Sequence, residues 1–292
     1  MSVSKSEAEL YDRQIRIWGL EGQCKLKTGR VWITGSLSAL GLEVGKNIVL
    51  SGVGSLFLVD NSLLTADDVE QSFFFEPIHI GKSKSYAAQQ HLSTLNLNCN
   101  VFAVDMLTPI EGDLVVFCGL TKDLSLFTSL RSQKISCILC DSFNDCGVIF
   151  IDFGESFSYI WNSQKMTNHY VSLESLIHKL ESFCFPAFVP HKTVVLLYNY
   201  FSLVTRNSLP STSELSTVLL SLATNKRKPI PSQDELSEFS SLFSACSSYT
   251  TDMVVGGLVS QEVIKFFTRA GSPIDNTVVV DLNGGAPQIK IS

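Results

Sequence analysis

Strand-like and helix-like segments alternate along the chain between residues 30 and 140, and this alternation constrains the fold more than any other feature. Short apolar or β-branched runs are separated by longer stretches with helical spacing. We expect strands at 31–34, 55–60, 101–104, 114–118 and 135–140, and helices at 42–51, 81–95 and 123–132. This order predicts an α/β fold whose mainly parallel sheet is covered by helices on both faces.

The pattern changes after Asp141. Residues 148–153 and 155–160 predict an antiparallel hairpin that turns at Gly154. A serine-rich helical stretch, one further helix and two short strands follow, at 173–242, 251–268, 278–281 and 288–291. We therefore expect one domain made of residues 1–160 and 249–292, with 161–248 as a helical insertion within it.

Charge and cysteine usage exclude several classes of protein. A net charge of −6 argues against nucleic-acid binding, and the one compact basic run, at 226–228, is typical of a solvated loop. We expect no membrane span and no signal peptide, and a location in the nucleus and cytoplasm, because the eight cysteines lack a disulfide framework. Cys137 and Cys140 form a C-x-x-C, but on a strand they would point to opposite faces, so we expect no metal site.

The segment 10–20, near the start of the chain, predicts a helix with two distinct faces. Arg13 and Arg16 lie three residues apart on one face. Tyr11, Ile15 and Trp18 have the spacing of a second face that packs against the protein. Taken alone, this pattern is that of an ordinary amphipathic helix.

The turn at 35–41 follows the first expected strand, where a nucleotide-binding fold would place a glycine-rich phosphate loop. Only its two ends are glycine, and they lie six residues apart. The middle glycine, which lets a phosphate approach the backbone, is replaced by Leu37 or Ser38, so we expect side chains to obstruct the approach. Asp60, at the end of the second strand, would suit a dinucleotide ribose, but Leu37 argues against an oxidoreductase.

The run Tyr-Asp-Arg-Gln-Ile-Arg-Ile-Trp-Gly at 11–19 resembles the opening of the ThiF-like adenylation domains in enzymes that activate ubiquitin-like proteins. The segments around 31–48, 51–60, 81–88 and 254–265 are similar to later elements of the same domains. The resemblance covers residues 10 to about 160 and 249 to the end. It implies a Rossmann-like, ThiF-type fold.

The resemblance also implies that the nucleotide site is degraded. The arginine that clamps ATP in active members corresponds to Gln71, and the aspartate that holds Mg²⁺ corresponds to Leu120. Lys84 and Asp60 are retained, and Asp123 could reach the metal only in a shifted register. One lysine does not replace both metal and donors. We therefore expect this chain to bind no cofactor or metal, with ATP and Mg²⁺ held by a partner subunit.

Among two-subunit members, the chain resembles the smaller, non-catalytic subunit of SUMO-activating enzymes. This implies that Arg13 reaches the ATP γ-phosphate in the partner's site and that Arg16 supports it. The implied partners are the catalytic subunit, SUMO and, through the complex, the SUMO-conjugating enzyme. Residues expected at the partner interface are Tyr11, Ile15, Trp18, Val254, Val255, Gly256 and Gly257.

Two alternatives remain open from the sequence. A self-sufficient ThiF-like adenylyltransferase would need Asp123 as metal ligand and Lys84 in place of the missing arginine. A dinucleotide-binding oxidoreductase would use the turn at 35–41 and Asp60. Cys184, between two phenylalanines, is expected to be structural and not a thioester nucleophile, because an apolar neighbourhood raises a thiol pKa.

Overall fold

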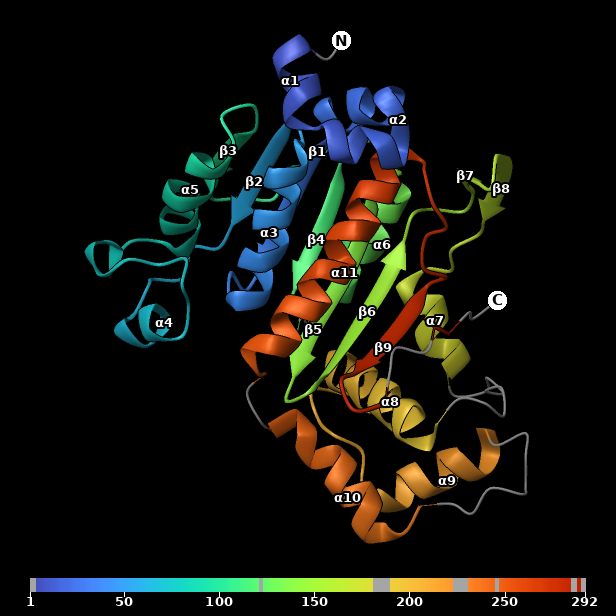
Figure 1. Cartoon of the computed structure of the whole chain (residues 1–292). Coiled ribbons are helices and arrows are strands. Elements are labelled where there is room, and N and C mark those ends of the chain that lie inside the picture. Colours follow the sequence, from blue (N-terminus) through green and yellow to red (C-terminus); the bar gives the residue numbers. More distant parts are fainter. Residues whose placement is uncertain are drawn as a thin grey trace.

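An eight-stranded sheet forms the centre of the protein in a computed structural model, which describes residues 4–120, 123–180, 190–222, 231–244, 247–284 and 288–289 (Figure 1). The strand order is β10-β9-β6-β5-β4-β1-β2-β3. Strands β3, β2, β1, β4 and β5 pair in parallel, and β6, β9 and β10 extend the sheet by antiparallel pairing. The mainly parallel α/β fold is therefore confirmed.

The strands of this sheet are short, as expected for an α/β protein. Their bounds are β1 (Arg30–Gly35), β2 (Ser55–Val59), β3 (Asn100–Ala103), β4 (Leu114–Cys118), β5 (Ser136–Phe143), β6 (Cys146–Asp152), β9 (Thr277–Asp281) and β10 (Gln288–Ile289). All five residues of β4 are buried, because side chains that alternate between the two faces meet a helical layer on each side.

Helices α2, α3, α5 and α11 lie on one face of the sheet, and α6, α7 and α8 lie on the other (Figure 1). Helix α11 packs along α3, where Gly256 lies against the side chain of Glu43. The bounds of the helices are α1 (Lys5–Leu10), α2 (Asp12–Lys27), α3 (Ala39–Ser51), α4 (Ala66–Glu70), η1 (Pro77–His79), α5 (Lys84–Leu95), α6 (Leu124–Ser132), α7 (Leu173–Leu180), α8 (His191–Arg206), α9 (Thr212–Leu222), α10 (Gln233–Ser241), η2 (Leu242–Ser244) and α11 (Tyr249–Thr268).

The predicted hairpin around Gly154 is wrong. Strand β6 pairs instead with β5 through a turn at Asn144, and a separate two-stranded sheet is formed by β7 (Phe157–Trp161) and β8 (Gln164–Asn168). Asn162 and Ser163 connect β7 to β8, and both have positive φ, as a two-residue hairpin turn requires. Gly154 (φ 92°) lies in the link between the two sheets.

The residues between β8 and α11 are largely helical where the structure describes them. Helix α8 packs on the sheet, and its Leu196, Leu197 and Tyr200 are buried in the same core cluster as Trp32 of β1. The helices begin at Leu173, because the first residues of the expected insertion belong to the β7–β8 hairpin. The domain boundaries at 160 and 249 stay a prediction.

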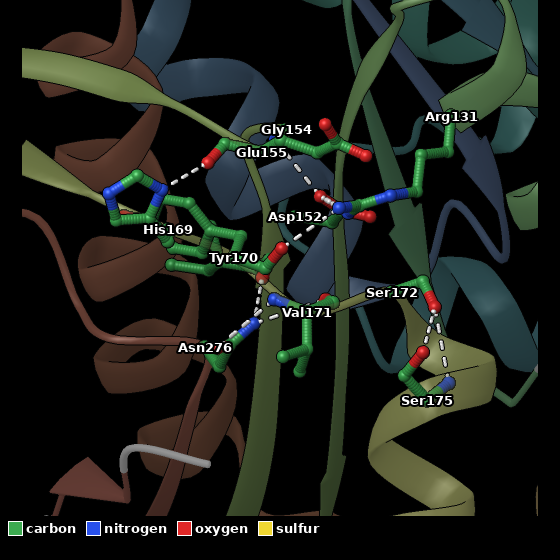
Figure 2. A network of polar contacts seen from close by, with 11 residues as sticks. Arg131, Asp152, Gly154, Glu155, His169, Tyr170, Val171, Ser172, Ser175 and Asn276 are labelled. Carbon is green, nitrogen blue, oxygen red and sulfur yellow. Dashed lines mark hydrogen bonds and ion pairs between the residues drawn. The ribbon is translucent and has the colours of Figure 1, made fainter. Parts of the chain in front are cut away.

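A polar network joins the segment after β8 to the main sheet (Figure 2). Arg131 of α6 forms an ion pair with Asp152 at the end of β6 and donates to the Tyr170 carbonyl oxygen at 2.9 Å. The Asn276 side chain donates to the carbonyl oxygens of Ile151 and Val171 at 3.2 and 3.3 Å. These contacts fix the point at which the chain enters the helical region.

Among the helices that the structure describes, none combines the length and apolar character needed to cross a membrane. Cys137 and Cys140 lie in the two different core clusters, so their side chains point to opposite faces of the sheet, as the strand pattern predicts. Cys184 and the basic run at 226–228 lie outside the described residues.

Candidate functional site

The turn that joins β1 to α3 makes its contacts within the protein, through the Leu37 side chain and the Leu37 backbone N–H. The side chain of Leu37 is fully buried in the core, so it does not cover the turn from outside as the sequence suggested. The backbone N–H of Leu37 donates to Asp60 Oδ2 at 2.9 Å. A donor that could serve a phosphate is therefore already satisfied by a buried carboxylate.

Asp60 is likewise occupied by contacts within the chain. Its second oxygen, Oδ1, accepts from the N–H and the hydroxyl of Ser62 at 3.0 and 2.6 Å. Gly35 (φ 96°) is needed for packing, because a Cβ there would lie 2.3 Å from the Cys118 carbonyl oxygen. The residues that suggested a dinucleotide site therefore have structural contacts that account for them.

An open cavity of about 490 Å³ lies beside the amino end of α3, where this kind of fold usually binds phosphates. Its described lining residues are Ser38, Ala39, Asp68, Gln71, Ser72, Phe75, Ser247, Tyr249 and Asp252. This described lining contains two carboxylates and neither lysine nor arginine. Ser38 and Gln71 were expected here from the sequence, whereas Asp68, Tyr249 and Asp252 were not. Asp68 and Asp252 each stand in the first turn of a helix, which is the sequence signal that they carry.

Lys84 is close to the cavity, but its charge is paired. Its Nζ atom lies 2.6 Å from Asp68 Oδ1, and both side chains are largely buried. The pKa of Asp68 is lowered, because hydrogen bonds from Lys84 and Thr65 together outweigh the effect of burial. The retained lysine therefore neutralises a carboxylate of its own chain.

The two candidate metal positions lie outside this lining. Leu120 follows β4 and is 40% exposed. Asp123 caps the first turn of α6, where its Oδ1 accepts from the N–H of Ser125 at 3.1 Å and from its hydroxyl at 2.5 Å. Within the described residues, no group of three or more His, Cys, Asp and Glu side chains could hold a metal ion.

Strand β5 contacts Asp252 of this lining through Ser142, and it carries a second carboxyl, Asp141, on its opposite face. Asp252 of α11 accepts from the Ser142 hydroxyl at 2.5 Å, and Asp141 precedes Ser142 on β5. Burial, together with the negative charge of Asp252, raises the pKa of Asp141 to about 7, although the hydrogen bond from the Ser142 N–H opposes the rise. Asp141 is therefore largely protonated below neutral pH in the folded protein.

We expect this carboxyl to make the protein less stable as the pH rises from about 4 to 7. The folded state keeps the proton of Asp141 up to about pH 7, whereas the unfolded chain loses it near the ordinary pKa of 3.8. Above pH 7, Asp141→Asn should raise the free energy of unfolding by about 2–4 kcal/mol relative to wild type, at roughly 1.4 kcal/mol per pKa unit. Below pH 4 the two proteins should be equally stable.

Urea unfolding between pH 4 and 8 measures this difference. Asp123→Asn serves as the matched control, because it changes an exposed carboxyl whose capping role asparagine can fill. Parallel stability profiles for wild type and Asp141→Asn would contradict the prediction.

The helix with the two arginines, α2, lies at the end of α3 opposite to its amino end (Figure 1). Tyr11 packs against Gly52 at the carboxyl end of α3, and its hydroxyl accepts from Asn96 at 2.8 Å. Ser38, at the amino end of α3, lines the cavity. The 13 residues of α3 place these ends about 20 Å apart. The arginines therefore lie far from the cavity of their own chain.

The two arginines differ in their surroundings. Arg16 forms an ion pair with Asp12 at 2.7 Å, and both side chains are mostly exposed. Arg13 is exposed and makes no hydrogen bond or ion pair within the described part of the chain. Tyr11 is buried, and Ile15 and Trp18 are half-buried, so these three side chains hold the helix to the protein.

The predicted interface residues on α11 divide between two faces. Val254 is 38% exposed, and open space surrounds Gly257. Val255 and Gly256 are buried, with Val255 packed against Gly147 of β6. The helical period places these two residues toward the sheet, so only Val254 and Gly257 remain for the predicted partner interface.

An apolar groove of about 580 Å³ runs between α2, the β7–β8 hairpin and α11. Ile17, Ile160 and Trp161 line it and are 78%, 58% and 49% exposed. Exposed apolar side chains gathered in this way are typical of a surface that binds another protein. The groove adjoins the helix that carries Arg13.

Comparison with known proteins identifies relatives along the whole chain. The sequence profile of the ThiF family matches residues 11–120. The Schizosaccharomyces pombe DNA damage tolerance protein rad31 is 26% identical over 99% of this chain and 98% of its own length. Xenopus laevis SUMO-activating enzyme subunit 1 is 27% identical over 96% of this chain and 94% of its own length. The human SUMO-activating enzyme subunit 1 is 38% identical over 94 residues, which are 32% of this chain and 27% of the human protein.

Solved structures share the fold. Escherichia coli MccB with MccA-N7isoASN superposes with a TM-score of 0.58 and 15% identity, over 100% of this chain and 74% of that chain. PaaA gives a TM-score of 0.60 and 14% identity, over 99% of this chain and 75% of that chain. Residues 11–120 of this chain therefore match the ThiF family, and relatives of 26% and 27% identity extend the similarity over nearly its full length.

Proposed function

We propose that this chain is the smaller, non-catalytic subunit of a SUMO-activating enzyme and that it supplies Arg13 to the ATP site of the catalytic subunit. Relatives named SUMO-activating enzyme subunit 1 match most of its length. The observation that carries the proposal is Arg13, which is exposed and makes no polar contact within the described residues. It lies near the end of α3 that is about 20 Å from the cavity, and the Leu37 N–H beside that cavity already bonds to Asp60.

The chemistry of adenylation explains why such an arginine is useful. The C-terminal carboxylate of SUMO attacks the α-phosphorus of ATP, the bond to the β-phosphate oxygen breaks, and pyrophosphate leaves. Negative charge grows on the leaving pyrophosphate, and a guanidinium beside it lowers the barrier. Because Arg13 lies far from its own cavity, it can act only in the site of a partner.

The cavity of this chain suits ATP poorly. The described lining contains Asp252 and no free lysine or arginine, and Lys84 nearby is already paired with Asp68, so no positive charge of the described residues is available there for a triphosphate. The N–H of Leu37 is bonded to Asp60. We therefore propose that ATP and Mg²⁺ bind in the catalytic subunit and that this chain holds neither.

The contact surface that we propose for the catalytic subunit is the outer side of α2 and α11. Ile17 and Leu20 of α2 and Met253 and Val254 of α11 are exposed there. An apolar surface of this kind needs a partner to cover it. Binding of SUMO and of the SUMO-conjugating enzyme by the complex, in the nucleus and cytoplasm, belongs to the same proposal.

ATP–pyrophosphate exchange that depends on SUMO tests the proposal. We expect no exchange with this chain alone or with the catalytic subunit alone, and full exchange when the two are mixed. Exchange by the isolated chain would contradict the proposal and favour a self-sufficient adenylyltransferase. Binding of NAD by the isolated chain, measured by calorimetry, would favour the oxidoreductase alternative.

A further inference from the structure

Helix α2 consists of two helical halves that meet at Gly19. The backbone there has φ 77° and ψ 167°, which no helix contains. The buried residues of α2 are Gly22, Gln23 and Leu26, and all of them follow Gly19. The half that carries Arg13, residues 12–18, is therefore separated by a kink from the half that packs in the core.

The arginine half is held at both of its ends. On one side, buried Tyr11 bonds to Asn96. On the other side, the Trp18 indole N–H donates to Gln23 at 2.8 Å, and Gln23 donates to the Ser51 carbonyl oxygen at 3.0 Å. With both ends fixed, the backbone angle at Gly19 sets the direction of the helical turns between them.

Packing does not explain why residue 19 is glycine. A Cβ at this position would have no atom within 4 Å, so a larger side chain would fit in the available space. The backbone conformation does explain it, because φ near +77° with ψ near 167° belongs to a region that only glycine occupies readily. Glycine is therefore required at position 19 by its backbone angles and not by a lack of space.

We propose that Gly19 is a positioning residue for Arg13 in the adenylation reaction, and this inference rests on the proposed function. The kink at Gly19 sets the direction of the arginine half, which Tyr11 and Trp18 hold against the protein, so that exposed Arg13 extends toward the partner subunit. An L-residue at position 19 favours negative φ, which would continue the helix and turn the arginine half off its contacts at Tyr11 and Trp18.

L-alanine and D-alanine at position 19 have side chains of the same size but opposite preferences for the sign of φ, so comparing them tests the backbone conformation alone. D-alanine favours positive φ and suits the conformation observed at Gly19, whereas L-alanine opposes it. Cys24 allows both to be made as full-length protein, because a synthetic peptide of residues 1–23 can be ligated to a chain that begins with Cys24. Gly19→Ala in its L and D forms therefore gives two proteins of identical composition.

The experiment measures SUMO adenylation by these proteins after reconstitution with the catalytic subunit. We expect the D form to keep kcat within about twofold of wild type and the L form to lose roughly tenfold, on the scale of a misplaced transition-state donor. KM for SUMO and the affinity between subunits should stay unchanged. Gly112→Ala is the matched control for replacing a positive-φ glycine with open space around it, and it should leave kcat unchanged.

The Arg13→Ala background distinguishes positioning from a structural role. If Gly19 acts through Arg13, the L form should reduce kcat by less than about twofold in that background, because coupled residues are not additive. Equal kcat values for the L and D forms, or a full tenfold loss without Arg13, would overturn the inference. If Arg13→Ala alone leaves kcat unchanged, the proposed function itself fails. Thermal unfolding of each protein shows whether a loss reflects unfolding, which would also overturn the positioning role.

Discussion

Arg13→Ala is expected to lower SUMO adenylation by the reconstituted two-subunit enzyme roughly tenfold to a thousandfold, the range for removing one transition-state donor. The side chain of Arg13 is exposed and makes no polar contact within the described residues. Its removal should therefore leave the fold and the subunit affinity intact. The loss should appear in kcat, because the guanidinium acts on charge that develops as pyrophosphate leaves.

Two other replacements on α2 show whether the effect is specific to Arg13. Arg16→Ala should cause a smaller loss, because Asp12 already holds that guanidinium at 2.7 Å. Lys25→Ala, on the other half of α2, removes an exposed charge paired with Glu21 and should have no effect on kcat. Single-turnover formation of the SUMO adenylate measures all three. An unchanged rate for Arg13→Ala with an intact heterodimer would mean that the helix serves packing alone.

Arg131→Met is expected to lower the free energy of unfolding by about 3–5 kcal/mol, the usual cost of leaving one member of a buried ion pair alone. Arg131 pairs with Asp152 and also donates to the Tyr170 carbonyl oxygen (Figure 2). The side chain of Asp152 is only 6% exposed. Burial raises the pKa of Asp152, and Arg131 opposes this rise, so removing Arg131 leaves a poorly solvated carboxyl.

Neutralising the carboxyl should recover part of this loss. Asp152→Asn in the Arg131→Met protein keeps an acceptor for the Gly154 N–H and removes the unpaired charge. Chemical denaturation of the wild type, both single variants and the double variant gives the coupling between the two residues. A double variant as unstable as the sum of the two single variants would contradict an ion pair as the source of stability.

The sequence by itself was sufficient to predict the parallel part of the main sheet. Strand β4 and the helices on either side follow from local patterns, because apolar runs of strand length between amphipathic helices have few other ways to bury their surface. The arginine helix was likewise predictable, because Arg13 and Arg16 lie three residues apart on one face, and Tyr11, Ile15 and Trp18 follow at intervals of four and three residues on the other. The hairpin around Gly154 was misplaced because glycine was favoured over Asn162 and Ser163, which adopt the positive φ angles of the turn.

Only the tertiary structure showed which polar groups beside the cavity pair with each other and which charged side chains stay exposed. Asp60 bonds to Leu37 across 23 residues, and Lys84 bonds to Asp68 across 16, so neither pairing can be read from neighbouring positions. Asp252 reaches the cavity because α11 packs along α3, although the two helices lie far apart in the sequence. A side chain's charge is fixed by its residue type, but the partner that uses this charge is fixed by packing between distant segments. For that reason Lys84 is paired inside its own chain, while Arg13 extends from the surface.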